Sequence, residues 1–158
     1  MIYKLGLKNK IDICEAVTRI RDMFEEFYIT DNKERKYLKD LNLIEKLLKQ
    51  QEIYAIAQKE IKGLLLIYRQ KGFRHYAKIL AEDNTSSRAL IKFLIWNFSN
   101  SDIYIKLKKI NPLVKYLLAE NPVTKKAMFK FAGDRGKEIL LYRKKEIKIN
   151  QTGAKDGI

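Results

Sequence analysis

The spacing of hydrophobic and polar positions predicts most of the elements of this 158-residue chain. Residues 2–8 alternate apolar and lysine-type positions, which favours a first strand. Apolar side chains then recur at helical spacing, which predicts amphipathic helices over 12–28 and 31–48. Asp12, followed three residues later by Glu15, is typical of a capping box at a helix start.

The pattern changes after the second helix, where short runs of β-branched, leucine and aromatic residues begin. Residues 52–58 and 61–69 flank a tight polar turn and therefore predict an antiparallel hairpin. A second turn at Lys71-Gly72 leads into a strand over 73–81. A helix over 85–99 follows, and apolar side chains surround it, so we expect it to be a buried central helix.

The rest of the chain predicts a strand, a helix that begins at a proline, and a closing hairpin with a glycine-rich turn at 133–136. These elements are expected at 102–108, 111–121, 126–132 and 138–143. The predicted order is β-α-α-β-β-β-α-β-α-β-β. A right-handed crossover through the helix 85–99 makes its two flanking strands parallel, whereas the hairpins are antiparallel. We therefore expect one α/β (α+β) domain over residues 1–145, with a mixed, mostly antiparallel sheet and helices on both faces. A polar, flexible tail is expected over 146–158.

Composition and charge limit the kinds of partner and the cellular location that we expect for this chain. The chain has 33 lysines and arginines against 19 acids, a net charge of +14, which attracts polyanions but also fits a lysine-rich surface that is merely well solvated. A single cysteine, Cys14, cannot form an internal disulfide, and no apolar run approaches the roughly 20 residues that cross a bilayer. The first ten residues are too polar for a secretion signal. We expect a cytoplasmic protein with no membrane partner.

The segment from Lys78 to Leu90 carries the strongest chemical indication. It predicts an apolar strand, a short polar loop and the start of a helix with hydroxyl side chains in its first turn. A helix start presents free backbone N–H groups and the positive end of the helix dipole, which together favour an anion. With one histidine and one cysteine, the chain excludes a metal site rich in those ligands, and no metal is expected.

Several segments resemble the GNAT superfamily of N-acetyltransferases. The stretch IYAIAQKEIKGLLLIY is similar to the second and third strands of that family, with Gly63 where the family usually opens its third strand on a glycine. Residues 73–99 resemble the strand, loop and helix that bind the pantetheine arm and pyrophosphate of acetyl-CoA. Asn111, followed by apolar residues at helical spacing, is similar to the start of the fourth helix, and the closing hairpin that ends in ILLYRKK is similar to the last two strands.

This resemblance implies an acyl-CoA-dependent N-acyltransferase that moves an acetyl group from acetyl-CoA to a small-molecule or peptide amine by direct attack. Backbone amides at the end of the strand would polarise the thioester carbonyl. The cofactor-binding residues that the resemblance implies are Leu80, Ala81, Thr85, Ser86, Ser87, Arg88, Ala89 and Asn111.

Catalytic candidates follow from the proton transfers that this reaction needs. A base could be His75 on the strand or Glu82 at its end, although each also fits a structural or solvated role. The acid could be Tyr116, Tyr104 or Tyr142, all of which equally fit residues at the edge of a core.

Two departures from the family pattern leave other functions open. The loop has no glycine and carries Glu82 and Asp83, which would repel a pyrophosphate unless they turn away; Arg88 could partly offset them. Leu118 stands where the family often has its tyrosine, and Tyr116 points roughly 200° away around the helix.

The alternatives are therefore a non-catalytic relative that acts as a binding module and a basic nucleic-acid-binding protein. In the second, the side chains of Phe73, Tyr76 and Tyr104 would stack on bases. A terminal strand could also pair two copies into a homodimer.

Overall fold

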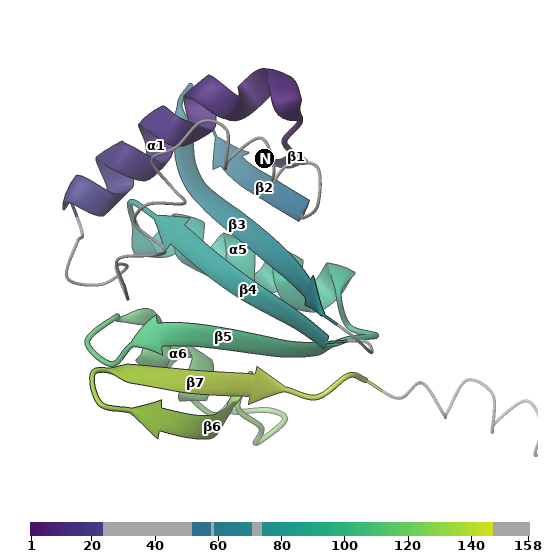
Figure 1. Ribbon diagram of the computed structural model, residues 1–158. Helices are drawn as coiled ribbons and strands as arrows, with labels where there is room; N and C mark the ends of the chain where they lie inside the picture. Colours follow the sequence, from purple (N-terminus) through teal and green to yellow (C-terminus); the bar gives the residue numbers. More distant parts are fainter. Residues whose placement is uncertain (24–51, 58, 71–73, 147–158) are drawn as a thin grey trace, which may run out of the picture.

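The computed structural model describes residues 1–23, 52–57, 59–70 and 74–146 (Figure 1). In these residues seven strands form one sheet in the order β1-β2-β3-β4-β5-β7-β6. The strands are β1 Ile2–Lys4, β2 Glu52–Ala57, β3 Ile61–Gln70, β4 Arg74–Ala81, β5 Asp102–Lys108, β6 Lys130–Arg135 and β7 Glu138–Arg143. A short 3-10 turn, Leu7–Asn9, precedes the helices α1 Lys10–Met23, α5 Asn84–Asn97 and α6 Leu113–Leu118.

The sheet is mixed, as the sequence predicts. β4 and β5 are parallel and are joined through α5, whereas every other neighbouring pair is antiparallel. The predicted second helix at 31–48, the turn at Lys71-Gly72 and nearly all of the tail at 146–158 lie outside the described residues.

The helices cover opposite faces of the sheet because side chains alternate along each strand. On one face α1 packs Ile13, Val17 and Ile20 against Leu64 and Leu66. The neighbouring residues of β3 point to the other face, where α5 and α6 form a second, larger core. The members of that core include Leu65, Ile67, Ile79, Leu90, Ile91, Leu94, Ile105, Leu117 and Leu141.

β4 and β5 share only part of their length. Their ladder runs from the pair Arg74↔Asp102 to the pair Ala77↔Ile105. Beyond it, β4 continues along β3, and β5 continues along β7. Figure 1 shows the two strands diverging toward their carboxyl ends. The sheet is therefore split between the ends of β4 and β5, and α5 begins at this split.

Backbone groups of β4 point into this split. Ile79 and Leu80 pair with consecutive residues of β3. In an antiparallel ladder, consecutive residues alternate between exchanging hydrogen bonds with the partner strand and directing their N–H and C=O to the opposite side. One of these two residues therefore presents its backbone groups to the side that β5 has left.

At the N-terminus the predicted strand over 2–8 is too long. β1 ends at Lys4, because the chain turns at Gly6: its N–H donates to Asn9 Oδ1 at 3.1 Å, and its carbonyl accepts from Asn9 N–H at 2.9 Å. Since α1 begins at Lys10, Asp12 lies in its first turn and is not the capping residue.

The start and the exposure of α5 also differ from the prediction. Asp83 is the N-cap, and its carboxylate accepts from Ser86 N–H at 2.6 Å, so a carboxylate caps the helix in place of a hydroxyl. The helix is not buried on all sides: Trp96 is 84% exposed. Apolar composition alone misled the prediction, because one face of α5 meets the sheet and the other meets solvent.

The closing elements are shifted relative to the prediction. α6 ends at Leu118, short of Asn121, whose Oδ1 accepts from Val123 N–H at 2.8 Å in a turn. β6 covers Lys130–Arg135, so the predicted strand over 126–132 begins too early and most of the predicted turn is strand. The true turn is Gly136-Lys137, where Gly136 has φ of +68°, a conformation that glycine adopts without strain.

Candidate functional site

The connection between β4 and α5 is very short. β4 ends at Ala81, α5 begins at Asn84, and only Glu82 and Asp83 lie between them. The Asp83 carboxylate occupies Ser86 N–H, one of the amides that a helix start offers to an anion. The amides of the first two helical residues keep the orientation of a helix start, but a negative charge already stands beside them.

Glu82 is turned away from the helix start. Its carboxylate lies 2.7 Å from Lys62 Nζ on β3 and 3.4 Å from an Arg19 guanidinium nitrogen on α1, and the side chain is 18% exposed. Lys62 also gains from the contact: the hydrogen bond and the charge of Glu82 raise the pKa of its amine. Because two cations hold this carboxylate, Glu82 is poorly placed to act as a general base.

The hydroxyl side chains in the first turn of α5 have different roles. Ser86 and Ser87 are buried, and the Ser87 hydroxyl donates back to the carbonyl of Asn84 at 3.1 Å. Thr85 is exposed, and Ala89 is half-buried. Of the three hydroxyls, that of Thr85 is therefore the one that is presented to solvent.

Arg88, at the start of the second turn of α5, joins this helix to α6. Its guanidinium carbon lies 4.7 Å from the centre of the Tyr116 ring, in a cation–π contact. The structure thus brings together two residues that the sequence placed in different roles, a cofactor-binding cation and a candidate acid. Leu118, at the position where the family often has its tyrosine, instead packs against the core.

Asn111 carries an unsatisfied polar group at the split. It follows the end of β5, is 3% exposed, and accepts from Leu113 N–H through Oδ1 at 3.0 Å, which starts α6. Its Nδ2 is buried and has no hydrogen-bond partner among the described residues. Buried donors are nearly always paired, so this open donor is an exception that calls for an explanation.

Leu80 and Ala81 lie at the end of β4, and both side chains are buried. Ala81 pairs with Gly63 of β3. The two residues therefore contribute backbone atoms to the wall of the split.

His75 lies at the opposite end of β4 from Glu82. It is 7% exposed, and its ring centre lies 5.3 Å from that of Phe98 at the end of α5. Ala81 lies six positions further along the strand, a distance of about 20 Å. The structure does not bring the two candidate bases together.

The candidate acids Tyr104 and Tyr142 also lie away from the split. Their ring centres are 4.9 Å apart, and Tyr104 stacks on Tyr76 at 5.1 Å, where β4 and β5 still pair. These rings face one another across three strands, so their inner faces are not available to stack on nucleic-acid bases. Phe73, the other aromatic residue considered for that role, lies outside the described residues.

The ion-pair partners of Glu82 are site residues that the sequence did not reveal. Lys62 could have been found from strand register, because it precedes Gly63, which lies opposite the end of β4. The sequence gives no such indication for Arg19, because its contact with Glu82 depends on how α1 crosses the sheet.

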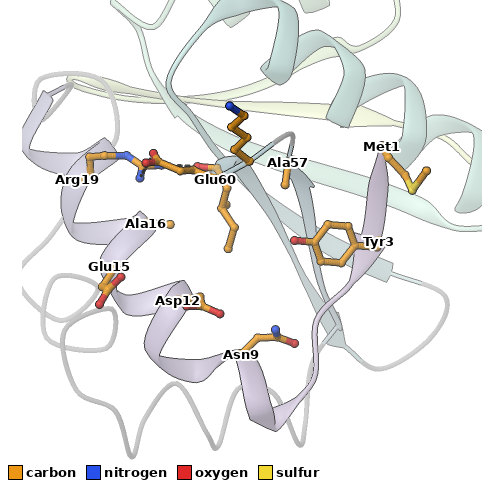
Figure 2. Close-up of a pocket in the computed structure, with 11 residues that line it drawn as sticks. Met1, Tyr3, Asn9, Asp12, Glu15, Ala16, Arg19, Ala57 and Glu60 are labelled. Carbon is orange, nitrogen blue, oxygen red and sulfur yellow. Dashed lines mark hydrogen bonds and ion pairs between the residues drawn. The ribbon is translucent and has the colours of Figure 1, made fainter.

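A separate pocket of about 480 Å³ lies between α1, β1 and the β2–β3 turn (Figure 2). Asp12, Glu15 and Tyr3 line it, and Arg19 and Glu60 meet at one end in an ion pair of 3.0 Å. This pocket lies at the β1–β2–β3 side of the sheet and is not part of the split between β4 and β5.

The described part of the chain contains neither a membrane-spanning helix nor a cluster of metal-binding side chains. Its helices are too short or too polar to traverse a lipid bilayer. No group of three or more histidine, cysteine or acidic side chains in the described ranges could hold a metal ion.

Comparison with known proteins gives a structural likeness without a sequence match. No family model and no curated protein matches the sequence. The fold is similar to an N-acetyltransferase from Staphylococcus aureus Mu50, at a TM-score of 0.67 and 14% identity over 91% of this chain and 96% of that one. A GNAT-family acetyltransferase from the same organism gives 0.61 and 14%, covering 90% and 97%.

The Campylobacter jejuni N-acetyltransferase PseH, solved in complex with acetyl coenzyme A, gives a TM-score of 0.57 and 13% identity, covering 92% of this chain and 100% of that one. These likenesses span nearly the full length of both chains in each comparison. The mixed seven-stranded sheet with its helices agrees with these likenesses. The chain therefore has the GNAT fold.

Proposed function

We propose that this protein is a divergent GNAT-superfamily N-acyltransferase. It takes an acyl group from a pantetheine thioester, with acetyl-CoA as the simplest donor, and transfers it to an amine by direct attack. The observation that carries the proposal is the split sheet: a pantetheine arm has amide and carbonyl groups along its length, and the edge of β4 and Asn111 Nδ2 offer hydrogen-bonding groups at the same opening.

The chemistry fits these groups. The attacking amine forms a C–N bond with the thioester carbonyl and loses a proton, while the C–S bond breaks and the thiolate takes up a proton. A backbone N–H of Ile79 or Leu80 on the open side of β4 would stabilise the negative charge that develops on the carbonyl oxygen. Asn111 Nδ2 would hold the arm against the end of β5.

Tyr116 is the group that we propose for protonating the thiolate. It lies on α6, where its ring contacts the Arg88 guanidinium, and it is half-buried. His75 and Glu82 are not proposed as bases, because the first lies at the far end of β4 and the second is held by two cations. The amine therefore loses its proton to water.

Acetyl transfer from acetyl-CoA and from acetyl-pantetheine to a panel of amines tests the proposal, with release of free thiol as the readout. We expect transfer with both donors. Tyr116→Phe should lower kcat by about 10²-fold and leave the KM for the donor nearly unchanged. Thiol release from neither donor, together with no stabilisation of the fold by either, would instead identify a non-catalytic module.

A further inference from the structure

We propose that the physiological donor is an acyl group on the phosphopantetheine arm of an acidic carrier protein, which docks on α5. The docking surface, here called the α5 stripe, consists of Arg88, Lys92 and Trp96. This inference rests on the proposed function, because it keeps the pantetheine thioester and assigns what carries it.

The first argument is the charge at the entrance. Coenzyme A brings a pyrophosphate and a further phosphate to the start of α5, where the Asp83 carboxylate already accepts from Ser86 N–H at 2.6 Å. The connection before α5 has only two residues and no glycine, so its backbone cannot wrap around a pyrophosphate. An arm attached to a protein brings one phosphodiester with a single negative charge, which suffers less repulsion from Asp83.

The second argument is the exposure of the α5 stripe. Its three residues are spaced four apart along the helix, so they follow one side of it over about 12 Å. All three are exposed, and Trp96 is 84% exposed. A tryptophan beside two cations is a typical centre of a protein–protein contact, whereas it has no packing role in this fold.

The third argument is charge complementarity. Neither α5 nor α6 contains an acidic residue, and Lys115 adds an exposed cation on α6. The whole chain has a net charge of +14. The α5 stripe begins at Arg88, one turn beyond the helix start where the arm would enter, so a partner seated on it would deliver its arm to the split. An acidic protein matches this surface better than nucleic acid does, because the tyrosine rings at the other end of β4 stack on one another.

The affinity of this protein for four probes tests which donor it uses. The probes are an acidic carrier protein with its phosphopantetheine arm, the same carrier without the arm, coenzyme A, and a single-stranded oligonucleotide. We expect the carrier with its arm to bind at least about tenfold more tightly than each of the other three at physiological salt. Lys92→Glu and Trp96→Ala should each weaken the carrier at least about tenfold and leave coenzyme A within about twofold. Lys8→Glu, an exposed lysine on the opposite side of the sheet, should change neither affinity.

Other outcomes would overturn the inference. Coenzyme A binding as tightly as the loaded carrier, or Lys92→Glu affecting the carrier no more than Lys8→Glu does, would contradict it. So would tighter binding of the oligonucleotide, which would assign the stripe to nucleic acid. Transfer from acetyl-pantetheine separates the two proposals. If that transfer occurs and the carrier is not preferred, only the carrier fails, whereas no transfer from any thioester would remove the proposed function itself.

Discussion

At the residue scale, Gly63 is the point where β3, β4 and α5 come closest. A Cβ atom at this position would lie 3.0 Å from Leu90 Cδ1 and 3.1 Å from both Ala81 Cβ and the Leu80 carbonyl oxygen. Two of these three neighbours belong to the end of β4, which forms the wall of the proposed site. The glycine is therefore required by close packing and not by an unusual backbone angle.

Gly63→Ala should lower the free energy of unfolding by about 1–3 kcal/mol, because the added methyl group overpacks this contact. Gly133→Ala is the matched control, since its Cβ would meet nothing closer than 3.9 Å, and it should change stability by less than about 0.5 kcal/mol. Denaturant unfolding of both variants checks the pair. Equal stability of the two variants would show that the close approach at Gly63 is wrong.

Asp83 has opposite effects on folding and on anion binding. Asp83→Ser keeps an N-cap oxygen and should leave the unfolding free energy within about 0.5 kcal/mol, whereas Asp83→Ala should cost about 1 kcal/mol. Both variants remove a negative charge beside the helix start, so both should bind coenzyme A at least about fivefold more tightly. Calorimetric titration and thermal unfolding separate the two effects. Weaker coenzyme A binding in Asp83→Ser would contradict the repulsion that we assign to this carboxylate.

At the element scale, the ion pairs of Glu82 connect α1, β3 and the end of β4. Arg19 and Lys62 approach the same carboxylate from different elements, and Arg19 also donates to the Ile61 carbonyl. This network fixes α1 relative to the strand that would bind the thioester. It also keeps one of the two loop acids away from the helix start.

The network predicts a pH dependence at the alkaline end. Glu82 raises the pKa of Lys62 above its ordinary value of 10.5 in the folded protein. A raised pKa means that the stabilisation is fully present below the unfolded value and is lost as the pH rises through the folded value. Lys62→Met should therefore be less stable than the wild type by a constant amount from neutral pH to about pH 10, and the difference should shrink above that. Denaturant midpoints measured across this range would refute the ion pair if the difference stayed constant throughout.

Asn111, at the junction of β5 and α6, has two roles that a substitution can separate. Its Oδ1 accepts from Leu113 N–H, and its Nδ2 is the group that we propose to bind the donor. Asn111→Ser keeps an oxygen that can accept from Leu113 N–H but removes Nδ2, the buried donor without a partner among the described residues. Donor KM should rise about tenfold, because an arm carbonyl would lose its hydrogen bond, while the helical signal remains near that of the wild type. An unchanged KM in steady-state assays would show that Nδ2 does not contact the donor. Asn121→Ser, at another asparagine whose Oδ1 starts a turn, is the control.

The elements were predictable to different degrees. The hairpin of β2 and β3 and the crossover through α5 could be predicted, because period and handedness fix them locally. The position of β6 could not, since it depends on Gly136 rather than Gly133 forming the turn and on a bulge between Phe131 and Gly133. The cap of α5 also differs from the prediction. From the sequence we interpret Asp83 only as a charge that repels a pyrophosphate, whereas in the structure it is the capping residue.

At the scale of the whole molecule, the fold agrees with the sequence resemblance, whereas only part of the site could be predicted. The sequence predicts Asn111 and Arg88 near a common ligand, and in the structure Arg88 lies on α5, which follows β4, while Asn111 lies just before α6, which follows β5. The sequence could not reveal that two cations hold Glu82, because these ion pairs depend on tertiary contacts between distant segments, whereas the place of His75 at the start of β4 follows from the predicted strand. The exposure of Lys92 and Trp96 on one side of α5 likewise becomes visible only in the structure.

The measurement that tests the central claim most directly is thermal unfolding with acetyl-pantetheine, acetyl-CoA and ATP, on the wild type and on Asn111→Ser. A ligand at 100 times its Kd stabilises a fold by about 2.7 kcal/mol. We predict that both thioesters raise the melting temperature of the wild type, that ATP does not, and that Asn111→Ser loses about half of the rise at the same thioester concentration. An equal rise with ATP, or a rise with the thioesters that is undiminished in Asn111→Ser, would contradict a pantetheine site in the split between β4 and β5.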